Sequence, residues 1–164
     1  MRLNLVESAN GYPIEAMIVS ASSADFPKKK DGWQFAWRSL GKTEGADFYK
    51  LVTVGSPTTI QGMLMLTLLY DEMVFMNNLE VAPHNYGNQG KYDHVAGGLI
   101  AFACYKSFEQ GRNSYLGYLS FDSKTQLIDL YQRKYGATRA IGHKMCFDPE
   151  AGKNLMQKYL NLKL

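Results

Sequence analysis

The sequence has little cysteine and no long apolar run. Its 164 residues include two cysteines, Cys104 and Cys146, which we interpret as buried free thiols, with a disulfide between them as the alternative. No stretch of 18 consecutive apolar residues is present, which excludes a membrane-spanning helix by length. The first residues also lack the apolar core of a secretory signal peptide. These absences predict a soluble, cytoplasmic protein with no membrane partner.

Histidine is also scarce, and its spacing does not indicate a metal site. The three histidines, His84, His94 and His143, do not form an H-x-x-x-H pair, and no carboxylate completes a ligand set with them. Neither cysteine has an obvious base partner, which argues against cysteine nucleophilic catalysis. We therefore expect no metal cofactor and no catalytic thiol.

The charge balance is close to even. Eighteen Lys and Arg residues against 15 Asp and Glu residues give a formal net charge of +3, without the basic stripes typical of nucleic-acid-binding proteins. The sharpest basic run, residues 28–30, is interpreted as a solvated loop, with an anionic partner as the alternative. Nucleic acid is not expected as a partner, with a nucleic-acid-binding accessory protein, suggested only by the basic pI near 8.8 and the many tyrosines, as the weaker alternative.

What is present is the composition of a folded globular protein. Hydrophobic residues make up 46% and charged residues 20%, a balance that supports a packed core rather than disorder. The length fits a single domain over residues 1–164. Aromatic residues reach 13%, including 11 tyrosines, which favours a well-packed sheet.

The order of the predicted elements indicates the fold class. Strand patterns dominate the first half, and strands alternate with helices afterwards. Residues 14–20 fit a strand or a helix. We predict an α/β (α+β) fold with a single mixed, mostly antiparallel central sheet of about six to seven strands and helices on both faces. The remaining predicted strands are 3–7, 48–54, 60–70, 73–81, 115–121 and 138–147, and the predicted helices are 33–40, 93–110, 124–135 and 150–160.

A glycine-rich turn follows the strand 73–81. Pro83 ends that strand, and a polar loop with Gly87 and Gly90 leads to a helix of small residues at Val95. The free N–H groups and the dipole at a helix start favour an anion, and Lys91 adds a positive charge. An ordinary loop with glycines at its turns is the alternative. The spacing does not match a nucleoside-triphosphate P-loop.

Three blocks in this region together resemble a known family. They are Leu79-Glu80-Val81-Ala82-Pro83, Val95-Ala96-Gly97-Gly98-Leu99-Ile100 and Leu130-Tyr131-Gln132-Arg133-Lys134-Tyr135-Gly136. Their order within residues 48–148 is similar to that of the GNAT superfamily of acyl-CoA N-acyltransferases, of which the chain looks like a divergent member. In the family's phosphate-loop motif, Lys91 stands for Gln or Arg and His94 for the central glycine. The family's pair of N-terminal helices is not recognisable in residues 10–47.

The resemblance implies a function and a set of site residues. It implies an N-acetyltransferase in which an amine attacks the thioester of acetyl-CoA, the co-substrate, directly. The acceptor would be a small-molecule or peptide amine. Tyr131 is implied as the acid that protonates the leaving thiolate. Glu80 is our hypothesis for the general base, directly or through water, with membership of a cross-strand ion pair as the alternative. The implied cofactor-binding residues are Leu79, Val81, Gly90, Lys91, His94, Val95, Ala96 and Lys124.

A second hypothesis is a GNAT-like fold without catalysis, serving as a CoA-binding or protein-interaction module. The acceptor-side residues would come from residues 10–47, the segment that the sequence patterns describe least. The identity of the amine and the formation of a homodimer are therefore left open.

Overall fold

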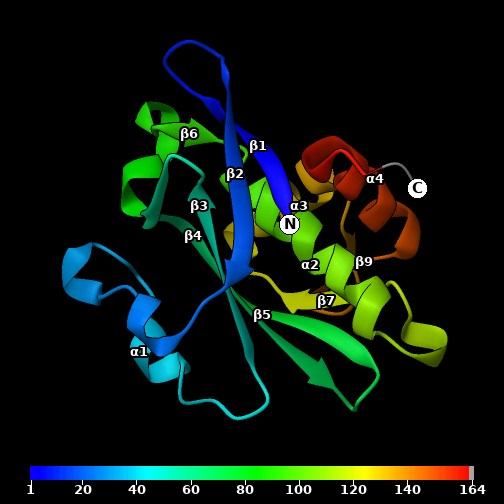
Figure 1. Cartoon of the computed structure of the whole chain (residues 1–164). Helices are drawn as coiled ribbons and strands as arrows, with labels where there is room; N and C mark the ends of the chain where they lie inside the picture. Colours follow the sequence, from blue (N-terminus) through cyan, green and yellow to red (C-terminus); the bar gives the residue numbers. More distant parts are fainter. Residues whose placement is uncertain (163–164) are drawn as a thin grey trace. The chain divides into compact units, whose positions relative to one another are not determined.

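The computed structural model of the protein describes residues 1–162, which divide into two compact units (Figure 1). The first unit comprises Met1–Met65 and Asn78–Leu99, and the second comprises Leu66–Asn77 and the chain from Ile100 onward. Strands β4 (Ser56–Leu69) and β5 (Met73–Val81) and helix α2 (Val95–Gln110) contribute residues to both units. A single domain over residues 1–164 remains a prediction, and its last two residues lie outside the described chain.

The described strands form one sheet in the order β6-β1-β2-β3-β4-β5-β7-β9-β8. The pairings of β1 with β2 and β6, of β2 with β3 and of β9 with β7 and β8 are antiparallel, and β5 pairs with β7 in parallel, which confirms the predicted mixed, mostly antiparallel sheet. Strands β4 and β5 occupy adjacent places, as predicted for a hairpin. The other strands are β1 (Arg2–Glu7), β2 (Pro13–Ser20), β3 (Asp47–Thr53), β6 (Tyr92–Asp93), β7 (Leu119–Asp122), β8 (Thr138–Arg139) and β9 (Lys144–Phe147).

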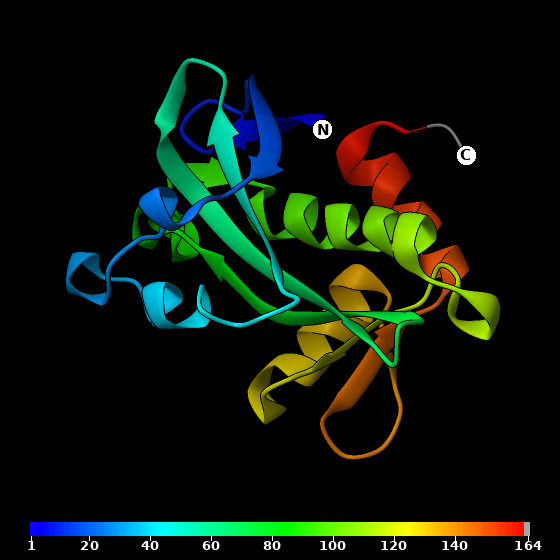
Figure 2. The same ribbon diagram turned by 60° about the horizontal axis from the view of Figure 1, so that its bottom comes forward.

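The predicted number of strands, six to seven, was wrong, because the described chain has nine. The predicted strand 138–147 is interrupted by a turn at Gly142, whose φ of +62° reverses the chain between β8 and β9. This hairpin is drawn in orange in Figure 2. The other additional strand, β6, has only two residues, which are paired with Val6 and Glu7 of β1. A two-residue strand is too short to show a periodicity in the sequence.

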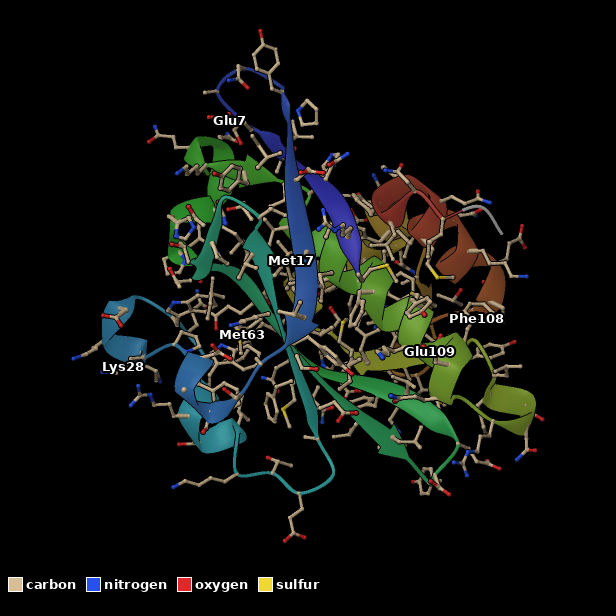
Figure 3. The ribbon with its side chains drawn as sticks, in the orientation of Figure 1. Glu7, Met17, Lys28, Met63, Phe108 and Glu109 are labelled. Carbon is tan, nitrogen blue, oxygen red and sulfur yellow. The ribbon has the colours of Figure 1, made fainter. Side chains whose placement is uncertain are left out.

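Two different layers cover the sheet of the first unit. Gly62 and Met63 are neighbours on β4, so they face opposite sides of the sheet. On one side, Gly62 lies against Val95 and Leu99 in the first turns of α2. On the other side, Met63, labelled in Figure 3, packs into an aromatic cluster. The first turns of α2 and the aromatic segment therefore lie on opposite faces of this part of the sheet.

The aromatic cluster is formed largely by the segment 21–46, which connects β2 to β3. Trp33 and Trp37 are buried at 8% and 0% exposure, and Phe26 packs on Phe48 with ring centroids 5.0 Å apart. Helix α1 (Trp37–Leu40) is only four residues long, so the predicted helix 33–40 is confirmed only in its second half. Packing of large aromatic side chains, rather than regular helix, fills this face of the sheet.

The second unit is built on β7 and β9. Leu119, Phe121, Met145 and Phe147 are all buried, and the register of the two strands places them on one face. Helix α3 (Ile128–Tyr135) ends at Gly136, which has a φ of +81°. Helix α4 (Pro149–Leu160) begins after the N-cap Asp148, whose side chain accepts a hydrogen bond from Ala151 N at 2.8 Å. None of the helices in residues 1–162 has both the length and the apolar character needed to cross a bilayer.

The contact between Gly62 and α2 predicts the effect of a single methyl group. A Cβ at position 62 would lie 2.8 Å from side-chain atoms of Val95 and Leu99 and 3.2 Å from the carbonyl oxygen of Glu80. We expect Gly62→Ala to lower the free energy of unfolding by roughly 1–3 kcal/mol, because the site is already filled. Urea unfolding followed by circular dichroism measures this change.

Gly55→Ala is the matched control. A Cβ there meets no atom within 4 Å, so its stability should stay within about 0.5 kcal/mol of the wild type or rise slightly. Equal stabilities of the two variants would contradict the packing described for Gly62.

Candidate functional site

The backbone of β5 is paired differently at its two ends. Near its start, Val74 and Phe75 pair in parallel with Leu119 and Ser120 of β7. Beyond Phe75, residues 76–81 have no pairing with β7 in the described chain. Half-buried Leu79 and Val81 lie in this part of the strand. Strand backbone without a neighbouring strand can pair with an extended ligand, which is the role implied for Leu79 and Val81.

The loop after β5 is fixed by a network of polar side chains. Asn85 is buried, and its Nδ2 donates to Gln61 Oε1 and to Gln61 O, at 2.9 and 3.2 Å. Its Oδ1 accepts from Tyr92 N at 3.0 Å, and His84 Nε2 lies 2.7 Å from Gln61 Oε1. Gly90 packs directly on this loop, since a Cβ there would lie 2.7 Å from the carbonyl carbon of Asn85. The loop is therefore ordered by its own side chains.

In the folded loop, most of the backbone N–H groups that the sequence suggested for binding an anion already donate hydrogen bonds within the chain. The loop bonds are Gly90 N to Gly87 O (3.1 Å), Lys91 N to His84 O (3.0 Å), Tyr92 N to Asn85 Oδ1 (3.0 Å) and His94 N to Asp93 Oδ1 (2.8 Å). Within α2, the bond from Gly98 N to His94 O, at 2.9 Å, closes the first turn. The N–H groups of residues 95–97 have no acceptor inside the helix. The candidate anion-binding groups are thus narrowed from residues 90–96 to the first turn of α2.

His94 and Lys91 flank that first turn. His94 has a φ of +73°, a left-handed conformation that glycine adopts most easily, at the position where the family motif has glycine. Lys91 is exposed, and its Nζ lies 5.3 Å from the centre of the Tyr92 ring. Burial, with Lys91 nearby, lowers the pKa of His84, so this imidazole is mainly neutral at pH 7.

Glu80 points from β5 into the aromatic face of the first unit. It is 5% exposed, and its carboxylate accepts four hydrogen bonds. Oε2 accepts from Gln34 N at 2.6 Å and from the Tyr86 hydroxyl at 3.0 Å. Oε1 accepts from Phe35 N at 3.1 Å and from Trp37 Nε1 at 2.9 Å. The carboxylate is compensated by these donors rather than by a cross-strand ion pair.

The Tyr86 hydroxyl is held in its neutral form by this contact. Burial and the hydrogen bond to Glu80 together raise the pKa of Tyr86 to about 12. At physiological pH it is therefore a hydrogen-bond donor to the carboxylate.

Tyr131 and Lys124 belong to the second unit. The Tyr131 ring, on α3, is partly buried and lies 4.8 Å, centroid to centroid, from the ring of Phe121. Burial raises the pKa of Tyr131, so its hydroxyl carries a proton at neutral pH. Its hydroxyl has no hydrogen bond within the part of the chain that is described. Lys124 is exposed at the N-cap of the 3₁₀ turn Thr125–Leu127 that precedes α3.

Several residues of the site were not identified from the sequence. The sequence marks Trp37 only as a buried aromatic residue, and nothing in it pairs Trp37 with a glutamate 43 residues away. Nothing in the sequence indicates Asn85. For Gln61 there is one weak signal, a polar residue inside the apolar run of β4. Within residues 1–162, no group of three or more His, Cys, Asp or Glu side chains is arranged to hold a metal ion.

Comparisons with known proteins show similarity in structure but not in sequence. No protein-family model matches the chain. No curated protein matches it. A structure of the KacTA–DNA complex matches with a TM-score of 0.62 at 9% identity, over 87% of this chain and 99% of that chain. AtaTR bound with acetyl-CoA matches with a TM-score of 0.58 at 14% identity, over 86% and 98%.

A GNAT family acetyltransferase from Elizabethkingia anophelis with acetyl-CoA bound also matches, with a TM-score of 0.55 at 16% identity, over 76% of this chain and 77% of that chain. The matches further include the AtaT–AtaR complex bound to DNA, with a TM-score of 0.57 at 12% identity, over 85% and 99%. The expectation that nucleic acid is not a partner was wrong, because the structures of similar fold include complexes bound to DNA. The similarity in structure shows that the chain has the GNAT fold.

Proposed function

We propose that the chain is an acetyl-CoA-dependent N-acetyltransferase that acts on an amine. The observation that carries this proposal is the similarity of its fold to proteins solved with acetyl-CoA bound, over three quarters or more of the chain. The edge of β5 opposite β4, which has no pairing with β7 beyond Phe75 in the described chain, and the first turn of α2 supply the two kinds of backbone group that such a ligand needs. The first suits the amides of the pantetheine arm, and the second suits the diphosphate.

Some of the proposed cofactor-binding residues would touch the cofactor directly, and others would fix the conformation of the loop beside it. The backbone at Leu79 and Val81 would pair with pantetheine, and the N–H groups at Val95 and Ala96 would hold the diphosphate, with the Lys91 ammonium nearby. Gly90 and His94 would act through the shape of the loop, since their own N–H groups are already bonded. Lys124 remains a predicted contact from the second unit.

The proposed chemistry is direct transfer. The amine nitrogen attacks the thioester carbonyl, the C–S bond breaks, and the thiolate takes a proton from the Tyr131 hydroxyl. The raised pKa of Tyr131 supports this role, because the group stays protonated until the thiolate forms. The attacking amine must also lose a proton. Glu80 could take it, directly or through water, only after one of its four hydrogen bonds breaks, because the four donors occupy the lone pairs of its carboxylate.

A module that binds CoA or a protein without catalysis is the second candidate. This second candidate is favoured because the loop N–H groups and the Glu80 carboxylate already make hydrogen bonds within the chain. Among the proteins of similar fold, the AtaT toxin was solved bound to the C-terminus of the antitoxin AtaR, and the AtaT–AtaR and KacTA complexes were solved with DNA. We therefore propose to test the acceptor with nucleic acids as well as with small amines and peptides. Homodimer formation and a cytoplasmic location remain predictions.

Acetyl-CoA binding tests the proposal first. Calorimetry should detect a complex with the wild-type protein, and Lys91→Ala should weaken it by about tenfold, the order expected for one charge near a phosphate. Lys42→Ala is the control, because Lys42 is an exposed lysine of the segment 21–46, and its dissociation constant should match the wild type. Absence of any complex would refute the proposed function.

Turnover tests Tyr131. With an accepted amine, Tyr131→Phe should lower kcat by roughly 10²-fold or more and leave the KM for acetyl-CoA within about twofold. Tyr12→Phe changes an exposed tyrosine of the β1–β2 turn and should keep the wild-type kcat. Equal kcat values for all three proteins would remove Tyr131 from the mechanism, and acetyl-CoA binding without any turnover would support the second candidate.

A further inference from the structure

The Glu80 carboxylate connects two segments of the first unit that are far apart in the sequence. Gln34, Phe35 and Trp37 precede it by 46, 45 and 43 residues, whereas Tyr86 follows it by six. The first three belong to the segment 21–46, and Tyr86 belongs to the loop between β5 and α2. Each carboxylate oxygen accepts two hydrogen bonds, and Oε2 bonds to both segments.

We propose that Glu80 is a positioning residue that couples the segment 34–37 to the loop after β5. This inference rests on the proposed function, because there Glu80 joins the segment expected on the acceptor side to the loop that leads into the proposed cofactor site. Glu80 then fixes the conformations of both segments, and a conformational change in either one alters the other.

The burial of the carboxylate makes the link strong. A carboxylate at 5% exposure depends on its donors, and losing one leaves an oxygen lone pair uncompensated. Three of the donors, Gln34 N, Phe35 N and Trp37 Nε1, are fixed by the packing of Trp33 and Trp37 against Met63. These donors cannot follow a moving carboxylate without disturbing the aromatic cluster.

The second side of the link is equally well fixed. Tyr86 is followed by the turn Gly87–Gln89 and preceded by Asn85, which is bonded to Gln61 on β4. A shift of this loop that moves the Tyr86 hydroxyl must either break its bond to Glu80 or carry the carboxylate with it. Buried polar networks of this kind respond as units, because each bond depends on the geometry of the others.

The contact also predicts how the tyrosine titrates. Because burial and the hydrogen bond to Glu80 raise the folded-state pKa of Tyr86 from its usual 10.0 to about 12, its contribution to stability is present below pH 10 and is lost as pH rises through 12. Absorbance at the tyrosinate band, wild type minus Tyr86→Phe, should show one titration with a midpoint near 12. A difference curve with a midpoint at pH 10 would mean that the hydroxyl is neither buried nor bonded to Glu80 in solution.

Amide hydrogen exchange tests the coupling directly. We expect Tyr86→Phe, a change in the loop, to speed exchange of the Gln34 and Phe35 amides and of the Trp37 indole N–H by roughly fivefold or more. Tyr92→Phe removes a hydroxyl from the same region that has no bond to Glu80, and it should leave these rates unchanged. Glu80→Gln places an NH2 donor against groups that themselves donate, so it should speed exchange of these three N–H groups further. Its circular dichroism spectrum would show whether this variant is folded. Wild-type rates in Tyr86→Phe would overturn the proposal even if Glu80→Gln does not fold.

Titration with acetyl-CoA separates this inference from the proposed function. In the wild type, binding should shift the indole N–H resonance of Trp37, and in Tyr86→Phe acetyl-CoA should still bind while this shift is largely lost. If acetyl-CoA binds the wild type without moving the Trp37 resonance, the coupling is overturned and the proposed function stands. If acetyl-CoA does not bind, the proposed function fails, and the exchange rates alone decide whether Glu80 links the two segments.

Discussion

A carboxylate held away from water requires hydrogen-bond donors, and Glu80 obtains all of them from residues outside its own strand. Three donors come from the segment 21–46, whose longest helix, α1, has four residues. Its internal backbone hydrogen bonds close short turns, such as Gly32 N to Lys29 O and Gly41 N to Trp37 O, and such turns do not by themselves hold the segment on the sheet. Its placement on the sheet therefore depends on this carboxylate as well as on the burial of Trp33 and Trp37.

The sequence patterns predict the long elements of the fold well. β5 begins and ends where predicted, because Pro83 follows it and removes a ladder donor, and α4 begins at Pro149 behind its Asp148 cap. The short elements were missed. β6 has two residues, and the turn at Gly142 lies inside a run that reads as one strand. Such elements depend on their neighbours in space, which local periodicity does not record.

The candidate site was only partly predictable for the same reason. The motif residues from Leu79 to Ala96 lie close together in the sequence, so their order alone indicates a strand, a loop and a helix start. Three of the four partners of Glu80 lie more than 40 residues away, and the occupied N–H groups of Gly90 and Lys91 depend on how the loop folds back on itself. The alternative interpretation of Glu80, an ion-pair member, also assumed a charged neighbour, whereas its donors are neutral backbone, indole and phenol groups.

The polar network around Asn85 has a consequence for how this chain compares with proteins of similar fold. A loop that is shaped by contacts of Gln61, His84 and Asn85 no longer needs a glycine motif to hold its course. His94 keeps the left-handed backbone at the place of the glycine without keeping the glycine. The path of the loop can then stay the same while its sequence motif changes, and a similarity in fold remains where the sequence shows none.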